Sequence, residues 1–233
     1  MTLAAGSEMA VLPPQSTSLD EVGSGLPPQS PRLASAQAPA PLKWTRDEFR
    51  ELARLGFFQG RRTFLLAGEI FEMASQGNWH VVVLELCLRS LRPAFPEADY
   101  WLRGQAPIDL PDGSSDPEPD IAIIKGDPKS FATHPSTALL IVEVADSSLK
   151  ADRRKANAYA SAGVQEYWIV DIAGRQVEVY RGPIPDPREP FGHRYDQFEV
   201  LRPGASISPL AAPGSTIAIA DLLPNQPIPN PDA

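Results

Sequence analysis

The hydrophobic and polar positions along the chain predict a mixed α/β protein. The most apolar stretch is typical of a strand that is covered on both faces of a sheet, and shorter apolar or alternating segments predict further strands. Residues 63–73 predict a hairpin that turns at Ala67-Gly68. The other expected strands cover residues 99–103, 120–124, 138–145, 166–172, 176–181 and 193–201.

Apolar residues at helical spacing predict three helices. Thr45 and Glu48 have the spacing of a capping box, and the helix that they open is expected to end at Gly56. Asn78 is expected to cap the second helix, because its side chain is suited to that position. The second and third helices are expected over residues 78–91 and 149–162.

The order of these elements predicts one domain over residues 42–223, in which helices flank a central mixed β-sheet. Residues 1–41 contain seven prolines among Ser, Ala, Gln and Gly. Such a segment buries too little apolar surface to offset its ordering entropy, so we expect a disordered N-terminal tail. Residues 224–233 are predicted to form a flexible C-terminal tail.

The composition argues against several classes of protein. Cys87 is the single cysteine, which excludes an internal disulfide and a multi-cysteine metal site. No stretch approaches the roughly 18 uninterrupted apolar residues that a membrane helix needs. Residues 1–14 lack the basic start and apolar core of a signal peptide. We therefore expect a soluble, cytoplasmic protein that does not associate with membranes.

The charge of the chain is unevenly distributed. A net charge of −8 argues against nucleic-acid binding, because phosphate contacts need a basic surface. Residues 97–127 hold eight acids and two bases, whereas residues 43–62 hold six bases and three acids. Ordinary solvated surface explains both segments as well as a binding role does.

Two carboxylates occupy positions in the strands where a structural chain would favour apolar residues. Asp120 stands at the start of one predicted strand and Glu143 lies inside the next. If these strands pair, the two side chains lie close together and repel each other unless a cation binds between them. Two carboxylates, a backbone carbonyl and waters form a ligand set that Mg²⁺ accepts. A salt bridge or an exposed strand end is the alternative for each residue.

The third predicted helix places a base near these acids. Asp152, Lys155 and Tyr159 follow at i, i+3 and i+7, so they share one helical face. An ammonium group beside a bound metal can orient a water nucleophile and stabilise the charge on a phosphate. The alternative for Lys155 is a simple intrahelical pair with Asp152.

The segments "PEPDIAII", "LLIVEVADSS" and "ADRRKANAYASAGVQEYWIVD" resemble the PD-(D/E)XK nuclease superfamily, and within it the Uma-type branch. The resemblance runs from about residue 41 to 223. It implies a restriction-endonuclease-like core and Mg²⁺-dependent hydrolysis of DNA, with Mn²⁺ as a substitute ion. Asp120 and Glu143 match the two acids of the motif, and the carbonyl of Val144 is the implied third metal ligand. The position that usually carries lysine is Ala145 here, so Lys155 is the implied catalytic lysine, with Asp152 orienting it.

The resemblance also implies contacts with nucleic acid and a possible homodimer. His80 matches a histidine often found in such proteins, although a capping or surface role is its alternative. The expected contacts to DNA are Arg61, Arg62, His80, Arg153 and Arg154. Solvated surface is the alternative for each arginine.

Two departures from the family pattern support a rival function. Relatives carry "ELIDG" in the first hairpin, whereas this chain reads "FLLAG", with Phe64 and Ala67 in place of the two acids. The rival is therefore a catalytically weakened nuclease fold that binds nucleic acid or protein. A metal-dependent phosphoesterase acting on small molecules is a third possibility, because the same ligand set would serve it.

Overall fold

The computed structural model describes residues 40–225. The predicted tails, residues 1–41 and 224–233, lie outside these residues except for residues 40, 41, 224 and 225. The α-helices are α1 (Arg46–Arg54), α2 (Asn78–Leu91) and α3 (Leu149–Ser161). The strands are β1 (Thr63–Leu66), β2 (Glu69–Glu72), β3 (Tyr100–Gly104), β4 (Ile121–Lys125), β5 (Leu140–Ala145), β6 (Glu166–Asp171), β7 (Gln176–Pro185), β8 (His193–Leu201), β9 (Ser206–Ile207) and β10 (Ile217–Ala218). Short 3₁₀ turns are η1 (Pro128–Ser130), η2 (Pro190–Gly192) and η3 (Ile219–Leu222).

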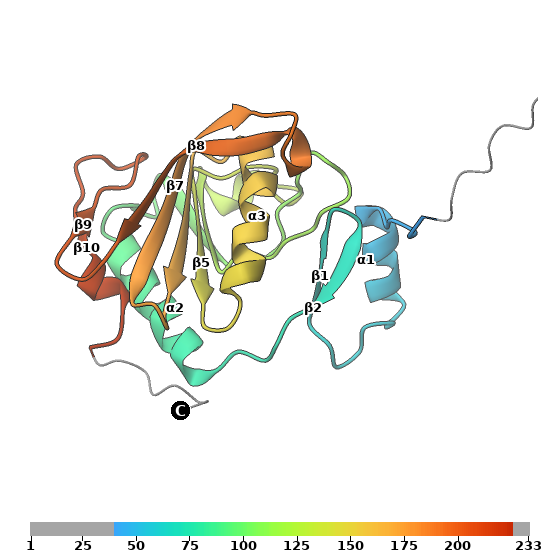
Figure 1. Cartoon of the computed structure of the whole chain (residues 1–233), viewed down its shortest axis with the longest axis horizontal. Helices are drawn as coiled ribbons and strands as arrows, with labels where there is room; N and C mark the ends of the chain where they lie inside the picture. The colour runs from blue at the N-terminus through green and yellow to red at the C-terminus, as the bar shows by residue number, and fades with distance from the viewer. Residues whose placement is uncertain (1–39, 226–233) are drawn as a thin grey trace, which may run out of the picture. The chain divides into compact units, whose positions relative to one another are not determined.

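A six-stranded mixed sheet in the order β3-β4-β5-β6-β7-β8 forms the centre of the fold. Strands β5 and β6 are parallel and all other neighbours in this sheet are antiparallel. The two parallel strands are joined through α3, because a parallel pair needs a long crossover connection. Figure 1 shows α3 across the face of the sheet that is turned toward the viewer. The predicted fold class, a mixed sheet flanked by helices, is confirmed.

The two faces of the sheet bury separate apolar clusters. One cluster joins α2 to Val142 and Val144 of β5, and the other joins α3 to Ile141 and Ala145 of the same strand. This alternation explains why the strand is apolar on both faces. Glu143 lies between Ile141 and Ala145 in the period-two pattern, so its carboxylate points to the side of α3.

The predictions at the element ends are partly confirmed. The capping box is present, since the Thr45 hydroxyl and the Glu48 carboxylate each accept a hydrogen bond from the other residue's backbone N–H. The prediction that Asn78 caps α2 is wrong, because Gly77 is the N-cap and makes no side-chain cap bond. A Cβ at residue 77 would lie 3.0 Å from the Asp146 carboxylate, so that side chain would have to shift slightly to admit a larger residue.

The first hairpin turns where the sequence predicts. Ala67 and Gly68 have φ angles of 50° and 75°, as a two-residue turn between antiparallel strands requires. Alanine rarely adopts this conformation, and the Ser115 hydroxyl accepts a hydrogen bond of 2.9 Å from the Ala67 N–H, which helps to hold it. The hairpin of β9 and β10 was not predicted, because strands of two residues leave no periodic pattern.

Within residues 40–225, no helix combines the length and the apolar character that crossing a membrane requires.

Candidate active site

The pairing of β4 with β5 brings the two predicted acids together. Ile121 pairs with Val142, so the next position in the antiparallel register sets Asp120 opposite Glu143. One oxygen of Asp120 (Oδ2) accepts a hydrogen bond of 2.8 Å from the Val144 N–H. Glu143 Oε2 lies 3.3 Å from the Asp120 N–H, which donates to it. Both side chains are buried, so the acids share one enclosed corner at the end of the strands.

Helix α3 brings Lys155 into the same corner. Its Nζ donates to Glu143 Oε1 over 3.0 Å and to Asp152 Oδ1 over 2.8 Å. Only 6% of Lys155 is exposed. The predicted convergence of the three charged groups is therefore present, and the alternative pair with Asp152 exists at the same time. The amine bridges a strand and its own helix.

Two tyrosines that sequence reasoning did not assign to the site hold these groups in place. The hydroxyl of Tyr159 donates to Glu143 Oε1 over 2.8 Å, and that of Tyr167 donates to the Asp152 carbonyl over 2.9 Å. Both rings are fully buried and pack edge to face. The i+7 spacing of Tyr159 from Asp152 was the signal that could have identified it, since it puts the hydroxyl on the face that carries Lys155.

Helix α2 contributes His80 from its first turn. Its Nε2 atom lies 3.1 Å from Asp120 Oδ1, and the Gln76 amide nitrogen lies 3.1 Å from the same ring nitrogen. Gln105 donates to Asp120 Oδ1 over 3.3 Å. The structure thus places His80 in contact with Asp120 rather than on the open surface.

Burial and neighbouring charges shift the pKa of each group. Burial strongly raises the pKa of Glu143, with Lys155 opposing the increase and the two nearby carboxylates adding to it. Burial works against the charged amine of Lys155, but Glu143 and Asp152 outweigh it and raise the Lys155 pKa. For Asp120, burial is outweighed by the hydrogen bond and charge of His80, so its pKa is lowered. The pKa of His80 is raised, because contact with Asp120 exceeds the effect of burial.

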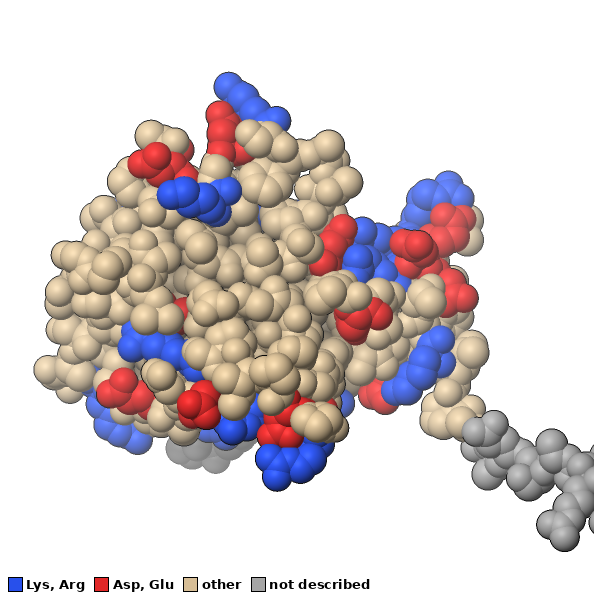
Figure 2. Space-filling view, turned by 90° about the horizontal axis from the view of Figure 1, so that it is seen from above, with Lys and Arg blue, Asp and Glu red and all other residues tan. Residues whose placement is uncertain are grey.

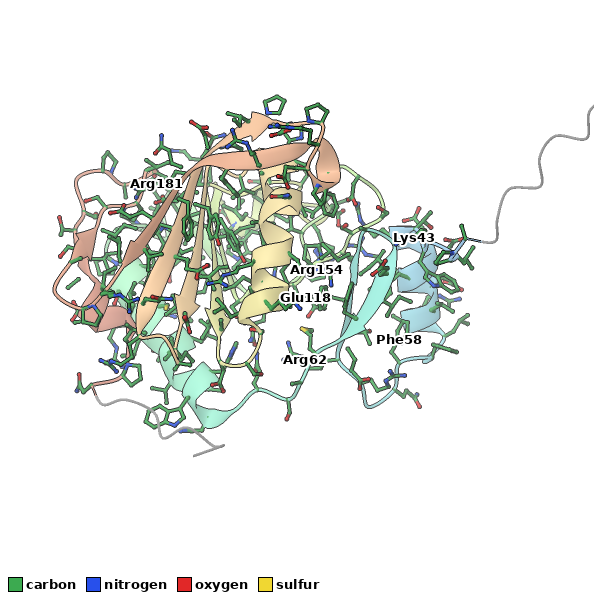
Figure 3. All side chains as sticks on the ribbon, in the orientation of Figure 1. Lys43, Phe58, Arg62, Glu118, Arg154 and Arg181 are labelled. Atoms are coloured by element: carbon green, nitrogen blue, oxygen red, sulfur yellow. The ribbon has the colours of Figure 1, made fainter. Side chains whose placement is uncertain are left out.

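These side chains line a pocket of about 260 Å³ between α3, the hairpin β1–β2 and the segment that leads into α2. The ring of Phe64 covers one side, with the Lys155 amine 5.1 Å from its centroid. Figure 3 shows Arg62, Glu118 and Arg154 between α3 and the hairpin. Glu118 lines the pocket two residues before Asp120, and burial raises its pKa.

The four arginines predicted to contact nucleic acid differ in their surroundings. Arg62 lines the pocket, and among the described residues its side chain makes no hydrogen bond or ion pair. Arg61 pairs with Glu72 over 2.7 Å. Arg153 binds the buried carboxylate of Glu178, and its Nε–Oε2 distance is 2.9 Å.

Arg154 stands over the ring of Phe71, with 5.1 Å between the guanidinium carbon and the ring centroid. It is more than half exposed and lies 4.0 Å from Glu69. Of the four arginines, Arg62 is thus the one that lines the pocket without a partner, whereas Arg153 belongs to a structural ion pair.

The site has the donors for a divalent cation that keeps part of its water shell. Among residues 40–225, no three His, Cys, Asp or Glu side chains are grouped tightly enough to hold an ion by themselves. A divalent ion here would be held by the carboxylates of Asp120 and Glu143 with the backbone carbonyl of Val144 and waters, a sparse oxygen set that Mg²⁺ accepts. Burial, with Asp152 and Asp120, raises the pKa of Glu143 although Lys155 opposes it, and a divalent ion beside the carboxylates would favour their charged form.

Comparison with known proteins assigns the chain to a family. Residues 46–220 match the family model Uma2, described as "Putative restriction endonuclease". The chain belongs to the Uma2 family. The match includes Asp120 directly before β4, Glu143 in β5 and Lys155 in α3 of this Uma2 chain. The resemblance noted from the sequence is therefore confirmed.

A solved structure shares the fold of this Uma2 protein. It is described as that of "a putative nuclease belonging to DUF820 from Anabaena variabilis ATCC 29413". The two align with a TM-score of 0.60 at 18% sequence identity, covering 77% of this chain and 97% of the other. No curated protein matches the chain. At this identity the structural match shows a common fold.

Proposed function

We propose that this Uma2 protein is a divalent-metal-dependent endonuclease that hydrolyses phosphodiester bonds in DNA. The observation that carries the proposal is the convergence of Asp120, Glu143 and Lys155 in one buried corner of a pocket. Three carboxylates, those of Asp120, Glu143 and Asp152, surround one amine in this corner, so the group is unfavourable unless a carboxylate holds a proton or a cation binds. Such an arrangement is costly for a purely structural site, whereas perturbed pKa values are common at catalytic sites.

Each residue of the cluster has a role in this proposal. Asp120, Glu143 and the Val144 carbonyl would hold Mg²⁺, with Mn²⁺ as a substitute. The ion would supply positive charge beside the scissile phosphate and favour ionisation of water there. Lys155 would position the attacking water and stabilise charge that develops on the phosphate oxygens. Asp152 holds the Lys155 amine at 2.8 Å and so fixes its direction.

Substrate binding would depend on few basic groups. Arg62 lines the pocket, so it is the first candidate for a phosphate contact, followed by Arg61 and Arg154 at the hairpin. Figure 2 shows Lys and Arg mixed with Asp and Glu on the face that it presents, without a continuous basic patch. Non-specific binding to DNA is therefore expected to be weak and sensitive to salt. Cleavage of both strands would use a homodimer, which sedimentation analysis would detect.

A plasmid-nicking assay tests the proposal. Wild-type protein should convert supercoiled plasmid to open circles in the presence of Mg²⁺ or Mn²⁺ and not in EDTA. Asp120→Ala and Glu143→Ala should each abolish nicking, whereas Glu69→Ala, which removes an exposed acid of β2, should retain it. Circular dichroism would confirm that the variants fold. Nicking that persists in both site variants would show that another site or a contaminant cuts the plasmid.

The rival function, a binding module without catalysis, is favoured by one observation. Phe64 is almost fully buried against Phe71 and covers Lys155, in a position where family members carry an acid. A site that lost a supporting acid would bind metal weakly. Thermal melting during a titration with Mg²⁺ or Mn²⁺ separates the two functions. The nuclease should be stabilised by either ion, whereas the binding module should not respond even at concentrations well above physiological ones.

A further inference from the structure

His80 lies where it could share a cation with Asp120. Its Nε2 atom and Asp120 Oδ1 are 3.1 Å apart, and both residues line the pocket that contains Glu143. The side chain of His80 is only 12% exposed, so the ring is enclosed by protein on most sides. It comes from α2, which packs against the face of the sheet opposite α3. The ring therefore approaches Asp120 from the side that Lys155 does not occupy.

The separation of these two atoms is that of neighbouring ligands around one ion. Two donor atoms at right angles, each about 2.1 Å from an octahedral cation, are about 3.0 Å apart. The measured 3.1 Å is close to that separation, and an ion bound there would replace the hydrogen bond between the two side chains and the Gln76 amide, which lies 3.1 Å from the same ring nitrogen. The Val144 N–H donates to the other oxygen of Asp120 over 2.8 Å, so Oδ1 is the oxygen that faces the ring. One nitrogen from α2 and one oxygen from the residue before β4 thus lie side by side.

We propose that His80 is a nitrogen ligand of the divalent ion held by Asp120, and that it makes the site bind Mn²⁺ more tightly than Mg²⁺. This inference rests on the proposed function, because it concerns the same ion. Mg²⁺ strongly prefers oxygen ligands, whereas an imidazole nitrogen favours first-row transition metals. A site with oxygen ligands alone would discriminate much less between the two ions.

Two other roles of His80 would give different results. A ring that only fixes the orientation of Asp120 would affect both ions equally, because it would act through a ligand that they share. A ring that contacts nucleic acid, as the sequence predicts, would affect DNA affinity and leave metal affinity unchanged. The relative affinity for Mn²⁺ and Mg²⁺ is therefore the quantity to measure.

Calorimetric titration of the full chain with Mn²⁺ alone and Mg²⁺ alone would measure this preference. We expect wild type to bind Mn²⁺ at least about tenfold more tightly than Mg²⁺. His80→Gln should weaken Mn²⁺ binding by about tenfold and change Mg²⁺ binding by less than about twofold. The matched control is His193→Gln in β8, since that ring contacts only a backbone carbonyl, at 3.2 Å. It should behave as wild type. Melting curves in EDTA would show that both variants are folded.

Pulsed electron paramagnetic resonance of bound Mn²⁺ gives a direct readout of a nitrogen ligand. Wild type and His193→Gln should show ¹⁴N modulation of the Mn²⁺ echo, and His80→Gln should lose it. Mn²⁺ that binds wild type without this modulation, or with a preference that survives His80→Gln, would overturn the inference and leave the proposed nuclease intact. If neither ion binds wild type, both the inference and the proposed metal dependence are wrong.

Discussion

Neutralising Glu143 should change how the stability of the metal-free protein depends on pH. Burial raises the pKa of Glu143 to about 8, with Asp152 and Asp120 adding to the increase and Lys155 opposing it. In the unfolded chain the same carboxyl titrates near its ordinary value of about 4.3. Between these two values the folded protein holds a proton that the unfolded chain has released. Stability therefore falls as pH rises through this window, and the loss is complete above the folded pKa.

The size of the effect follows from the two pKa values. One pKa unit corresponds to about 1.4 kcal/mol, so raising the pH from 6 to 8 should cost the metal-free wild type about 2 kcal/mol through Glu143. For a domain of this size, that amounts to a fall in melting temperature of about 4–8 °C. Glu143→Gln carries no titrating group at this position and should lack this part of the pH dependence. The difference in stability between variant and wild type should therefore shift by about 2 kcal/mol in favour of the variant from pH 6 to pH 8 in EDTA.

Melting curves in EDTA at several pH values between 6 and 8 would test this. The control is Glu178→Gln, which alters an equally buried glutamate whose pKa is lowered, because its bonds to Arg153 and Tyr180 outweigh burial. That variant should lose stability at every pH and keep the slope of wild type. Saturating Mg²⁺ should flatten or reverse the wild-type slope. Equal slopes for wild type and Glu143→Gln would refute the reasoning, since Glu143 would then be ionised throughout the range.

Further substitutions separate the roles of the basic residues. Lys155→Met should abolish DNA cleavage, whereas calorimetry should still detect Mn²⁺ binding. Urea unfolding should show that the variant is less stable by about 3–5 kcal/mol, because the substitution leaves buried carboxylates unpaired. Arg62→Ala should leave the free energy of unfolding within about 0.5 kcal/mol of wild type. The slope of DNA affinity against salt concentration should fall by the amount that corresponds to about one phosphate contact. Arg153→Ala should instead destabilise the fold, because the buried carboxylate of Glu178 loses its charged partner. DNA affinity, measured by fluorescence anisotropy, should change less than it does in Arg62→Ala.

Most of the fold could be predicted from the sequence because its main elements carry strong periodic patterns. The continuous apolar run of β5 and the alternation of β7 and β8 each indicated a strand, and the capping box marked the start of α1. Hairpin β9–β10 is too short for a pattern to show. The N-cap of α2 is Gly77, which has no side chain and makes no side-chain cap bond, so no cap residue marks this helix start in the sequence.

The candidate site was predictable where residue type and spacing were unusual. Glu143 inside an apolar strand and Lys155 at helical spacing from Asp152 both departed from what packing alone favours. The contribution of Tyr159 could not be separated from an ordinary core tyrosine, and the enclosed position of His80 depends on how α2 packs on the sheet. Arg153 shows the opposite case. Its charge suggested a phosphate contact, but a buried partner on β7 binds it.

A manganese-soaked crystal tests the central claim most directly. The account predicts an anomalous peak in the pocket, within about 2.5 Å of carboxylate oxygens of Asp120 and Glu143, with the Lys155 amine beside it but not bound to it. A peak that contacts neither carboxylate, or a pocket that stays without a peak at saturating manganese, would contradict it.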